Sequence, residues 1–318
     1  MNVTQVRHDT YDVLGIGCVA IDDFWLVPQF PPPDAKMAVD RVERHCGGLT
    51  GTALVAAARL GARCAYGGLI GKSDPLSRAV EDDFIAEGID VSPAVRQTDA
   101  RPIHSLVIVG TQQKTRNIFF HIGGPAGTAD DGVVPEFIQQ TRVLFVDQYG
   151  LAGAIKAMAT ASAFGVQCVA DVENNEDPLT QSFLDAVNHL ILPEDFALHH
   201  TRTRDPITAI QRLWSPARQA VVVTCGERGS WWCDLRDGKP GPVSHQPAFD
   251  VNVVDTTGCG DVFHGAYAAA LAEKRSTASR IKFASAAAAL KATRIGGRVG
   301  IPTRTELDAF LHDHSVSI

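Results

Sequence analysis

The residues Asp255-Thr-Thr-Gly-Cys-Gly-Asp261, followed by Val-Phe-His-Gly-Ala-Tyr-Ala-Ala-Ala-Leu, place two glycines and a carboxylate at the start of an apolar helix. Backbone N–H groups at a helix N-terminus lack an intrahelical acceptor, and the helix dipole makes that end electropositive. Gly258 and Gly260 carry no side chain, so a phosphate can approach these N–H groups closely. Asp261 beside such an anion hole is suited to take the proton of a hydroxyl while the N–H groups hold a phosphoryl group. The stretch therefore predicts phosphoryl transfer to an alcohol.

The same run resembles the second signature of the ribokinase (pfkB-type) family of sugar kinases, whose usual form is Asp-Thr-x-Gly-Ala-Gly-Asp. Cys259 stands where the family usually has alanine, but its backbone N–H is still available. The resemblance covers residues 12 to about 310 and implies that Gly258, Cys259, Gly260 and Asp261 are the catalytic residues. The alternative interpretation is a tight loop and helix cap with Asp261 as a favourable first-turn charge. A cap alone does not need Gly-x-Gly-Asp after Asp-Thr-Thr.

Bulk composition limits the class of protein. The chain has 318 residues, 45% of them hydrophobic and 20% charged, as in a globular protein with a substantial core. No apolar stretch approaches the length of about twenty residues that crosses a membrane, and the polar residues 1–10 lack the apolar middle of a signal peptide. Seven scattered cysteines fit neither a disulfide framework nor a zinc site, so a cytoplasmic location is expected. The net charge of −7 argues against a nucleic-acid partner.

The order of apolar and amphipathic segments predicts the fold class. Short apolar runs start at residues 11, 64, 143, 167, 189 and 220, and helical patterns lie between most of them. This alternation favours a parallel sheet covered by helices on both faces. The last third adds three helices, at about 260–273, 278–293 and 303–312. The resemblance implies one ribokinase-like domain over residues 1–318, a three-layer α/β/α fold with a mainly parallel central sheet.

Two regions break the alternation. Residues 21–45 and 102–121 are typical of strands with little helix between them, and antiparallel strands inserted in a parallel α/β domain cannot easily join its core. They are expected to form a flap, which in the ribokinase resemblance is a small antiparallel β lid that closes over the sugar and often mediates a homodimer. Closure would exclude water and protect ATP from hydrolysis. Lys36 and Arg116, both in this lid, are candidates to contact an anionic sugar.

A nucleotide site is expected at the carboxyl ends of the strands. The run 221–229 is similar to the family's Thr-x-Gly-x-x-Gly, which implies that Thr224, Gly226 and Gly229 line the ATP. Glycines after a strand often form simple turns. The assignment to the nucleotide site therefore depends on the position of this run before the Asp261 loop, which is the arrangement in the family. Ser285 stands where the resemblance implies an adenine-contacting residue.

The sugar side of the site is expected near the N-terminus. Gly47 and Gly48 precede a helix and resemble the first family signature, Gly-Gly-x-x-x-Asn-x-Ala, although Thr52 replaces the asparagine. Asp22 follows the first strand, where the family has an aspartate that accepts hydrogen bonds from sugar hydroxyls. Asp23, its neighbour, is the alternative.

Cations complete the expected site. Mg²⁺ is expected from the chemistry, because it neutralises the β- and γ-phosphates. The family's Asn-x-x-Glu is not matched by residues 191–197, which leaves Glu194 or Asp195 as candidates. The family often binds a monovalent cation such as K⁺ beside the anion hole. The resemblance assigns its ligands to Asp255, the Thr257 carbonyl and carbonyls near Gly296 and Gly300.

Together these features predict an ATP-dependent sugar kinase that transfers the γ-phosphate to a hydroxymethyl group, with Asp261 as base. The C-terminal stretch is most similar to the ketohexokinase and sulfofructose kinase branch, which favours a ketose or a ketose derivative. Two alternatives stay open: a nucleoside kinase, and a catalytically silent sugar- or nucleotide-binding regulatory protein of the same fold. A dinucleotide-binding dehydrogenase is disfavoured because no Gly-x-Gly-x-x-Gly follows the first strand.

Overall fold

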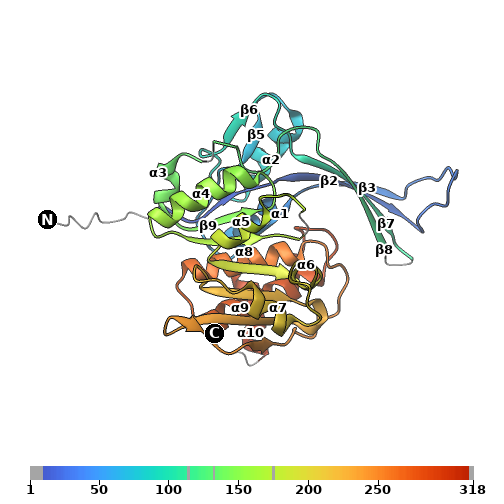
Figure 1. Ribbon diagram of the computed structural model, residues 1–318. Helices are drawn as coiled ribbons and strands as arrows, with labels where there is room; N and C mark the ends of the chain where they lie inside the picture. The colour runs from blue at the N-terminus through green and yellow to red at the C-terminus, as the bar shows by residue number, and fades with distance from the viewer. Residues whose placement is uncertain (1–9, 113–114, 132, 174–175, 315–318) are drawn as a thin grey trace.

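Figure 1 shows the computed structural model of the protein. The structure describes residues 10–112, 115–131, 133–173 and 176–314. Residues 1–9, on which the expectation about a signal peptide rests, lie outside this range.

The predicted mainly parallel central sheet is confirmed. Its strand order is β14-β13-β12-β11-β10-β9-β1-β4, and β15 also pairs with β13. Six neighbouring strands are parallel: β12 (Ala220–Thr224), β11 (His189–Pro193), β10 (Gln167–Asp171), β9 (Thr141–Asp147), β1 (Tyr11–Ile16) and β4 (Cys64–Tyr66). The antiparallel edge consists of β13 (Ser230–Arg236), β14 (Lys239–Pro240) and β15 (Ser244–Gln246). The parallel strands therefore bring their carboxyl ends to one edge of the sheet, where a ligand site is expected.

Alternate residues of the strands fill two separate cores. Val143 and Phe145 pack into one core, while Leu144 and Val146 pack into the other. The first core is covered by α1 (Leu49–Arg59), α2 (Pro75–Ala86), α8 (Cys259–Ala272), α9 (Thr277–Ala292) and α10 (Arg304–Asp313). The second is covered by α3 (Pro135–Gln139), α4 (Leu151–Ala163), α5 (Thr180–Ala186), α6 (Glu194–Thr201) and α7 (Pro206–Leu213). The three layers of the expected α/β/α fold are thus present.

Helices α1 and α8 pack closely enough to bring two glycine loops together. A Cβ on Gly265 of α8 would lie 2.9 Å from the Cα of Ala53 in α1 and would overlap its carbonyl oxygen. Only glycine allows this approach. Thr50 of α1 donates to Asp147 at the end of β9, and His264 of α8 lies 3.3 Å from Asp171 at the end of β10. Both helices therefore begin at the carboxyl edge of the sheet.

The lid is a four-stranded sheet that projects from the body (Figure 1). Its strands are β3 (Arg41–Gly47), β2 (Ala20–Val27), β7 (Ile103–Gly110) and β8 (Thr115–His121), in that spatial order. Both outer pairs are antiparallel, as expected for hairpins, but the central pair β2–β7 is parallel. The reason is that each hairpin leaves the body with its first strand, so the two first strands run side by side. A separate two-stranded sheet, β5 (Leu69–Gly71) with β6 (Val95–Gln97), lies beside the lid.

Candidate active site

The loop before α8 has the backbone shape of an anion hole. Gly258 is the N-cap of α8 with φ +77°, a conformation that favours glycine, and α8 begins at the next residue. The N–H of Cys259, expected to be available for an anion, instead donates to the Thr256 carbonyl oxygen at 3.2 Å because the loop turns tightly there, which leaves the N–H groups of Gly258 and Gly260. Asp261 lies in the first turn, where the helix dipole favours a negative charge.

Asp255 holds this loop in shape. Its Oδ1 accepts hydrogen bonds from the Thr257 N–H at 2.9 Å and the Thr257 hydroxyl at 2.7 Å. Its Oδ2 accepts from the Gly296 N–H at 2.8 Å. Burial alone would raise the pKa of Asp255, but these hydrogen bonds bring it below the usual value. Asp255 therefore stays ionised and ties the anion hole to the turn that follows α9.

A group of carboxylates faces the anion hole from the end of β10. A Cβ on Gly260 would lie 3.9 Å from Oε1 of Glu173, so this carboxylate stands beside the loop. Burial, followed by the charge of Glu173, raises the pKa of Asp261 well above its usual value. Asp171 is fully buried, and burial together with Glu173 and Asp261 raises its pKa as well. Like charges placed this close disfavour the ionised forms, so these acids hold protons more tightly than exposed ones.

The first turn of α8 is anchored by a buried histidine. His264 is buried, with Nδ1 at 2.8 Å from the Gly260 carbonyl oxygen and Nε2 at 3.1 Å from the Ile191 carbonyl oxygen. Its Nδ1 also lies 3.3 Å from the Asp171 carboxylate. His264 therefore fixes the first turn of α8 against β10 and β11.

On the sugar side, Asp22 and Gly47 are in direct contact. A Cβ on Gly47 would overlap Oδ2 of Asp22, so only glycine leaves this carboxylate in place. Asp23 points to the opposite face of β2, where Arg44 binds it at 2.7 Å and 2.9 Å and His104 at 2.8 Å. The structure thus separates the two candidates and leaves Asp22 facing the body.

Arg298 belongs to the same region and was missed by sequence reasoning. Its Nη2 donates to the Gly47 carbonyl oxygen at 2.9 Å, and it forms an ion pair with Asp83. Its Nε lies 3.5 Å from the hydroxyl of Thr52, the residue that replaces the family's asparagine. The charge of Arg298 counteracts the burial that raises the pKa of Asp22. Gly48, with φ +87°, starts α1 beside this group.

The predicted nucleotide residues share one cavity of about 760 Å³. Thr224, Gly226, Gly229 and Ser285 line it together with Cys259 and Gly260 of the anion hole. Its remaining walls are mostly apolar and include Phe249, Val251, Val253, Phe263 and Ala288. An apolar cavity that ends at an electropositive loop is suited to a purine base whose phosphates reach the loop.

The two lid cations predicted from the sequence occupy different positions. Arg116 reaches from β8 to the anion-hole loop, where its Nη1 donates to the Thr257 hydroxyl at 2.8 Å and lies 3.3 Å from Oδ1 of Asp255. Lys36 is exposed in the loop between β2 and β3. The structure therefore joins Arg116 to the phosphate side of the site and leaves Lys36 in the outer lid.

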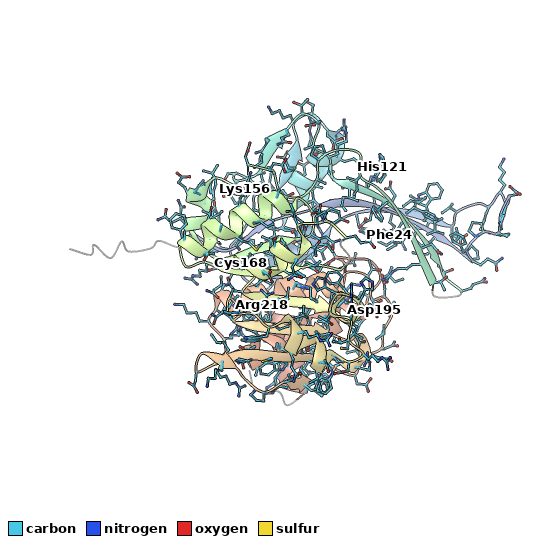
Figure 2. All side chains as sticks on the ribbon, in the orientation of Figure 1. Phe24, His121, Lys156, Cys168, Asp195 and Arg218 are labelled. Carbon is cyan, nitrogen blue, oxygen red and sulfur yellow. The ribbon has the colours of Figure 1, made fainter. Side chains whose placement is uncertain are left out.

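The residues expected to hold magnesium lie at the start of α6. Glu194 forms an ion pair with Arg228 of the nucleotide loop. Asp195 follows it in the first turn of α6, and Figure 2 shows it on the main body below the lid residue Phe24. Among the described residues, no group of three or more His, Cys, Asp or Glu side chains forms a metal cage. A magnesium ion bound here would take one or two carboxylates from the protein. Its other ligands would be phosphate oxygens and water, which is common for Mg²⁺.

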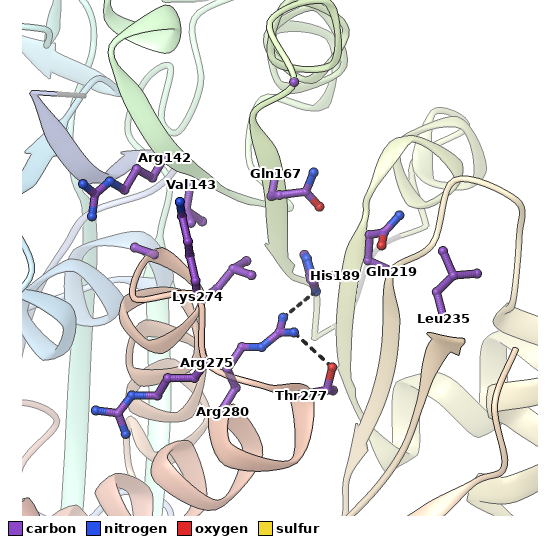
Figure 3. Close-up of a pocket in the computed structure, with 13 residues that line it drawn as sticks. Arg142, Val143, Gln167, His189, Gln219, Leu235, Lys274, Arg275, Thr277 and Arg280 are labelled. Atoms are coloured by element: carbon purple, nitrogen blue, oxygen red, sulfur yellow. Dashed lines mark hydrogen bonds between the residues drawn. The ribbon is translucent and has the colours of Figure 1, made fainter. Parts of the chain in front are cut away.

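A second cavity, of about 570 Å³, lies far from these residues. It opens at the amino-terminal ends of β9 to β12 and is lined by Arg142, Lys274, Arg275 and Arg280 among others (Figure 3). Arg280 contacts Nδ1 of His189 at 3.4 Å and the Thr277 hydroxyl at 3.0 Å. Ligands of open α/β sheets bind at the carboxyl ends of the strands, so the cavity beside the anion hole is the candidate active site.

Comparison with known proteins agrees with this geometry. The model of the pfkB family carbohydrate kinases matches residues 12–304. The chain belongs to this family. It is a phosphotransferase with an alcohol group as acceptor, as the loop at Asp261 predicted.

Individual relatives are similar over nearly their whole length. A ribokinase of Haemophilus influenzae is 27% identical over 93% of this chain and 97% of its own. The crystal structure of a putative ribokinase from Agrobacterium tumefaciens is 26% identical, with a TM-score of 0.86 over 96% of this chain and 99% of that one. A putative ribokinase II from E. coli in complex with ATP and Mg²⁺ shares the fold, with a TM-score of 0.81 at 19% identity over 95% and 99% of the two chains. No described helix of this chain is both long and apolar enough to span a membrane.

Proposed function

We propose that this kinase transfers the γ-phosphate of ATP to a hydroxymethyl group of a ketose or ketose derivative. The observation that carries the proposal is the position of Asp261 between two sites. The cavity lined by Thr224 and Gly229 ends at Gly260, while Asp22 and Gly47 belong to lid strands β2 and β3, and Asp22 is close enough for its charge to act on Asp261. A nucleotide in the cavity and a sugar at Asp22 would meet at the anion hole.

In the proposed reaction, Asp261 accepts the proton of the sugar hydroxyl as its oxygen attacks the γ-phosphorus. The bond from the γ-phosphorus to the β–γ bridging oxygen breaks, and ADP leaves with that electron pair. The N–H groups of Gly258 and Gly260 hold charge on the transferring group, an effect worth ~3–4 kcal/mol per donor where measured in acyl transfer. Arg116 adds a positive charge from the lid side.

Glu173 is the carboxylate best placed for magnesium. It stands next to Gly260, where a phosphate is expected, and a bare carboxylate beside a phosphate would repel it. Mg²⁺ bound between them would neutralise the phosphate charge and the acidic group around Asp261. Glu194, whose charge is balanced by Arg228, is less available for this role.

The preference for a ketose rests on the C-terminal stretch of the sequence alone. The relatives from Haemophilus influenzae and Agrobacterium tumefaciens are named as ribokinases and do not add to it. Arg116 is engaged by the anion-hole loop, which leaves Lys36 as the candidate to meet a sugar anion. All seven cysteines are free thiols, and this supports a location in the reducing cytoplasm.

ADP release with Mg-ATP across ketoses, aldoses, sulfo-sugars and nucleosides tests the proposal. Turnover with one or more ketoses well above all other acceptors is the expected result. Preference for ribose or for a nucleoside would overturn the substrate class while leaving the kinase assignment. Ligand binding without any ADP release would favour the catalytically silent protein instead.

A further inference from the structure

A buried lysine lies where the resemblance places a monovalent cation. Lys291, near the end of α9, is fully buried, with 0% of its surface exposed. Its Nζ donates to the backbone carbonyl oxygen of Asp255 at 2.8 Å. Burial of an ammonium group costs free energy unless the group is paired, so Lys291 requires negative groups around it.

Several negative groups lie near Lys291. Carbonyl groups at the end of α9 carry the negative end of the helix dipole, and that of Ala292 already accepts hydrogen bonds from Val254 and Asp255 at 2.8 Å and 3.1 Å. The Asp255 carboxylate belongs to the same residue whose carbonyl binds the lysine. Burial lowers the pKa of Lys291 and the nearby Arg116 adds to this effect, while Cys259, Asp255 and Asp261 act in the opposite direction.

One of the expected cation ligands, the Asp255 carboxylate, is meanwhile taken up by protein donors. Both carboxylate oxygens of Asp255 accept hydrogen bonds, from Thr257 and from Gly296. A Cβ on Gly300 would lie 2.5 Å from the carbonyl oxygen of Lys291, so this turn packs directly on the end of α9. With its carboxylate engaged by Thr257 and Gly296 and its carbonyl oxygen by Lys291, Asp255 fits an ammonium group better than a bound potassium ion.

We propose that the ammonium group of Lys291 is a built-in cation that orders the anion-hole loop, so that the enzyme needs no bound potassium ion. The lysine links α9 to the Asp255 carbonyl, and the Asp255 carboxylate in turn sets the positions of Thr257 and Gly296. An ammonium and a potassium ion are similar in size and charge, and the side chain supplies this charge at every salt composition.

The test compares KCl with choline chloride at matched ionic strength, using the wild type, Lys291→Met, and Lys282→Met as a control. Lys282 lies on the same helix and is partly exposed. Thermal unfolding of the protein without ligands is the first readout. The wild type and the control should show the same Tm in both salts. Lys291→Met should lose stability in choline and recover about 2 °C or more when potassium fills the vacated place.

ADP release is the second readout, and only this one rests on the proposed function. Wild-type turnover should be equal in the two salts, while Lys291→Met should lose on the order of 100-fold in choline and regain part of it with potassium or ammonium. A wild type that gains Tm or turnover from potassium specifically would overturn the inference, as would a Lys291→Met protein with full turnover in choline. If no sugar gives turnover, the proposed function fails and the Tm comparison still decides the role of Lys291. If Lys291→Met does not fold, the wild-type comparison decides it.

Discussion

At the residue scale, the charge around Asp261 determines when this side chain can act as a base. Burial and then the charge of Glu173 raise the pKa of both Asp261 and Asp171, and the charge of Asp261 raises that of Asp171 further. A carboxyl whose native pKa is raised binds more protons in the folded than in the unfolded state. The stability this provides is complete below the unfolded pKa of about 4 and is lost as pH rises through the raised native pKa.

Glu173→Gln should therefore make the protein without ligands less sensitive to rising pH. The substitution removes the charge that raises the pKa of Asp261 and Asp171, so Tm at about pH 8 should rise by about 2 °C, with little change at about pH 5. Thermal unfolding across this range is the measurement, with Glu176→Gln as an exposed control. An equal shift at both pH values would mean that Glu173 does not interact with the buried acids.

Some residues of the site can be predicted from the sequence and others cannot. The Asp255–Asp261 loop is predictable because its function is local: a glycine with positive φ, a helix start and a carboxylate within seven residues. Glu173, Arg298 and Lys291 were missed because each comes from a distant segment. Their meeting depends on the order of the strands and on the turn after α9, neither of which a local pattern contains.

At the element scale, the lid connects the two halves of the site. Asp22 pairs with Ser105 across β2 and β7, and Ser105 pairs with Phe120 of β8, so the three side chains share the lid face that contains Asp22. Arg116 lies on this same face by strand periodicity and reaches the anion-hole loop. Asp22 and Asp23 are successive strand residues, so their side chains point to opposite faces of the lid. Which of them faces the site follows from the pairing of β2 with β3 and β7, and the sequence of the two residues does not reveal it.

Arg116→Ala should slow turnover more than it weakens ATP binding. The substitution removes the charge next to the transferring phosphate and the hydrogen bond from the lid to Thr257, so kcat should fall by about 10²-fold. Steady-state kinetics with the best sugar is the measurement, and Arg41→Ala, on the exposed β3 edge, is the matched control. A change confined to the KM for sugar would instead assign Arg116 to sugar binding.

At the scale of the whole molecule, the lid exposes more apolar surface than a surface sheet needs. Trp25, Val42 and Phe119 share one face and are 40%, 59% and 55% exposed, while Ile118 and Phe120 lie on the other face at 48% and 62%. Exposed apolar groups that cluster in this way mark an interaction surface. A homodimer through the lid, which the family resemblance implies, remains our proposal for its partner.

A Trp25→Glu, Phe119→Glu double variant should be monomeric if this surface joins two copies. Two charges in the centre of an apolar interface would go unpaired and disfavour association. Light scattering coupled to size exclusion gives the mass directly, and the wild type should have twice the mass of the variant. A monomeric wild type would show that this surface does not join two copies of the chain.

Asp261 is the proposed base of the reaction, and Asp261→Asn removes that function alone. The amide keeps the size of the side chain but cannot accept the proton of the sugar hydroxyl, so single-turnover phosphoryl transfer should fall by about 10²–10⁴-fold. Binding of ATP and sugar, measured by calorimetry on the same protein, should stay close to wild type. Transfer at the wild-type rate with both ligands bound would show that Asp261 is not the base.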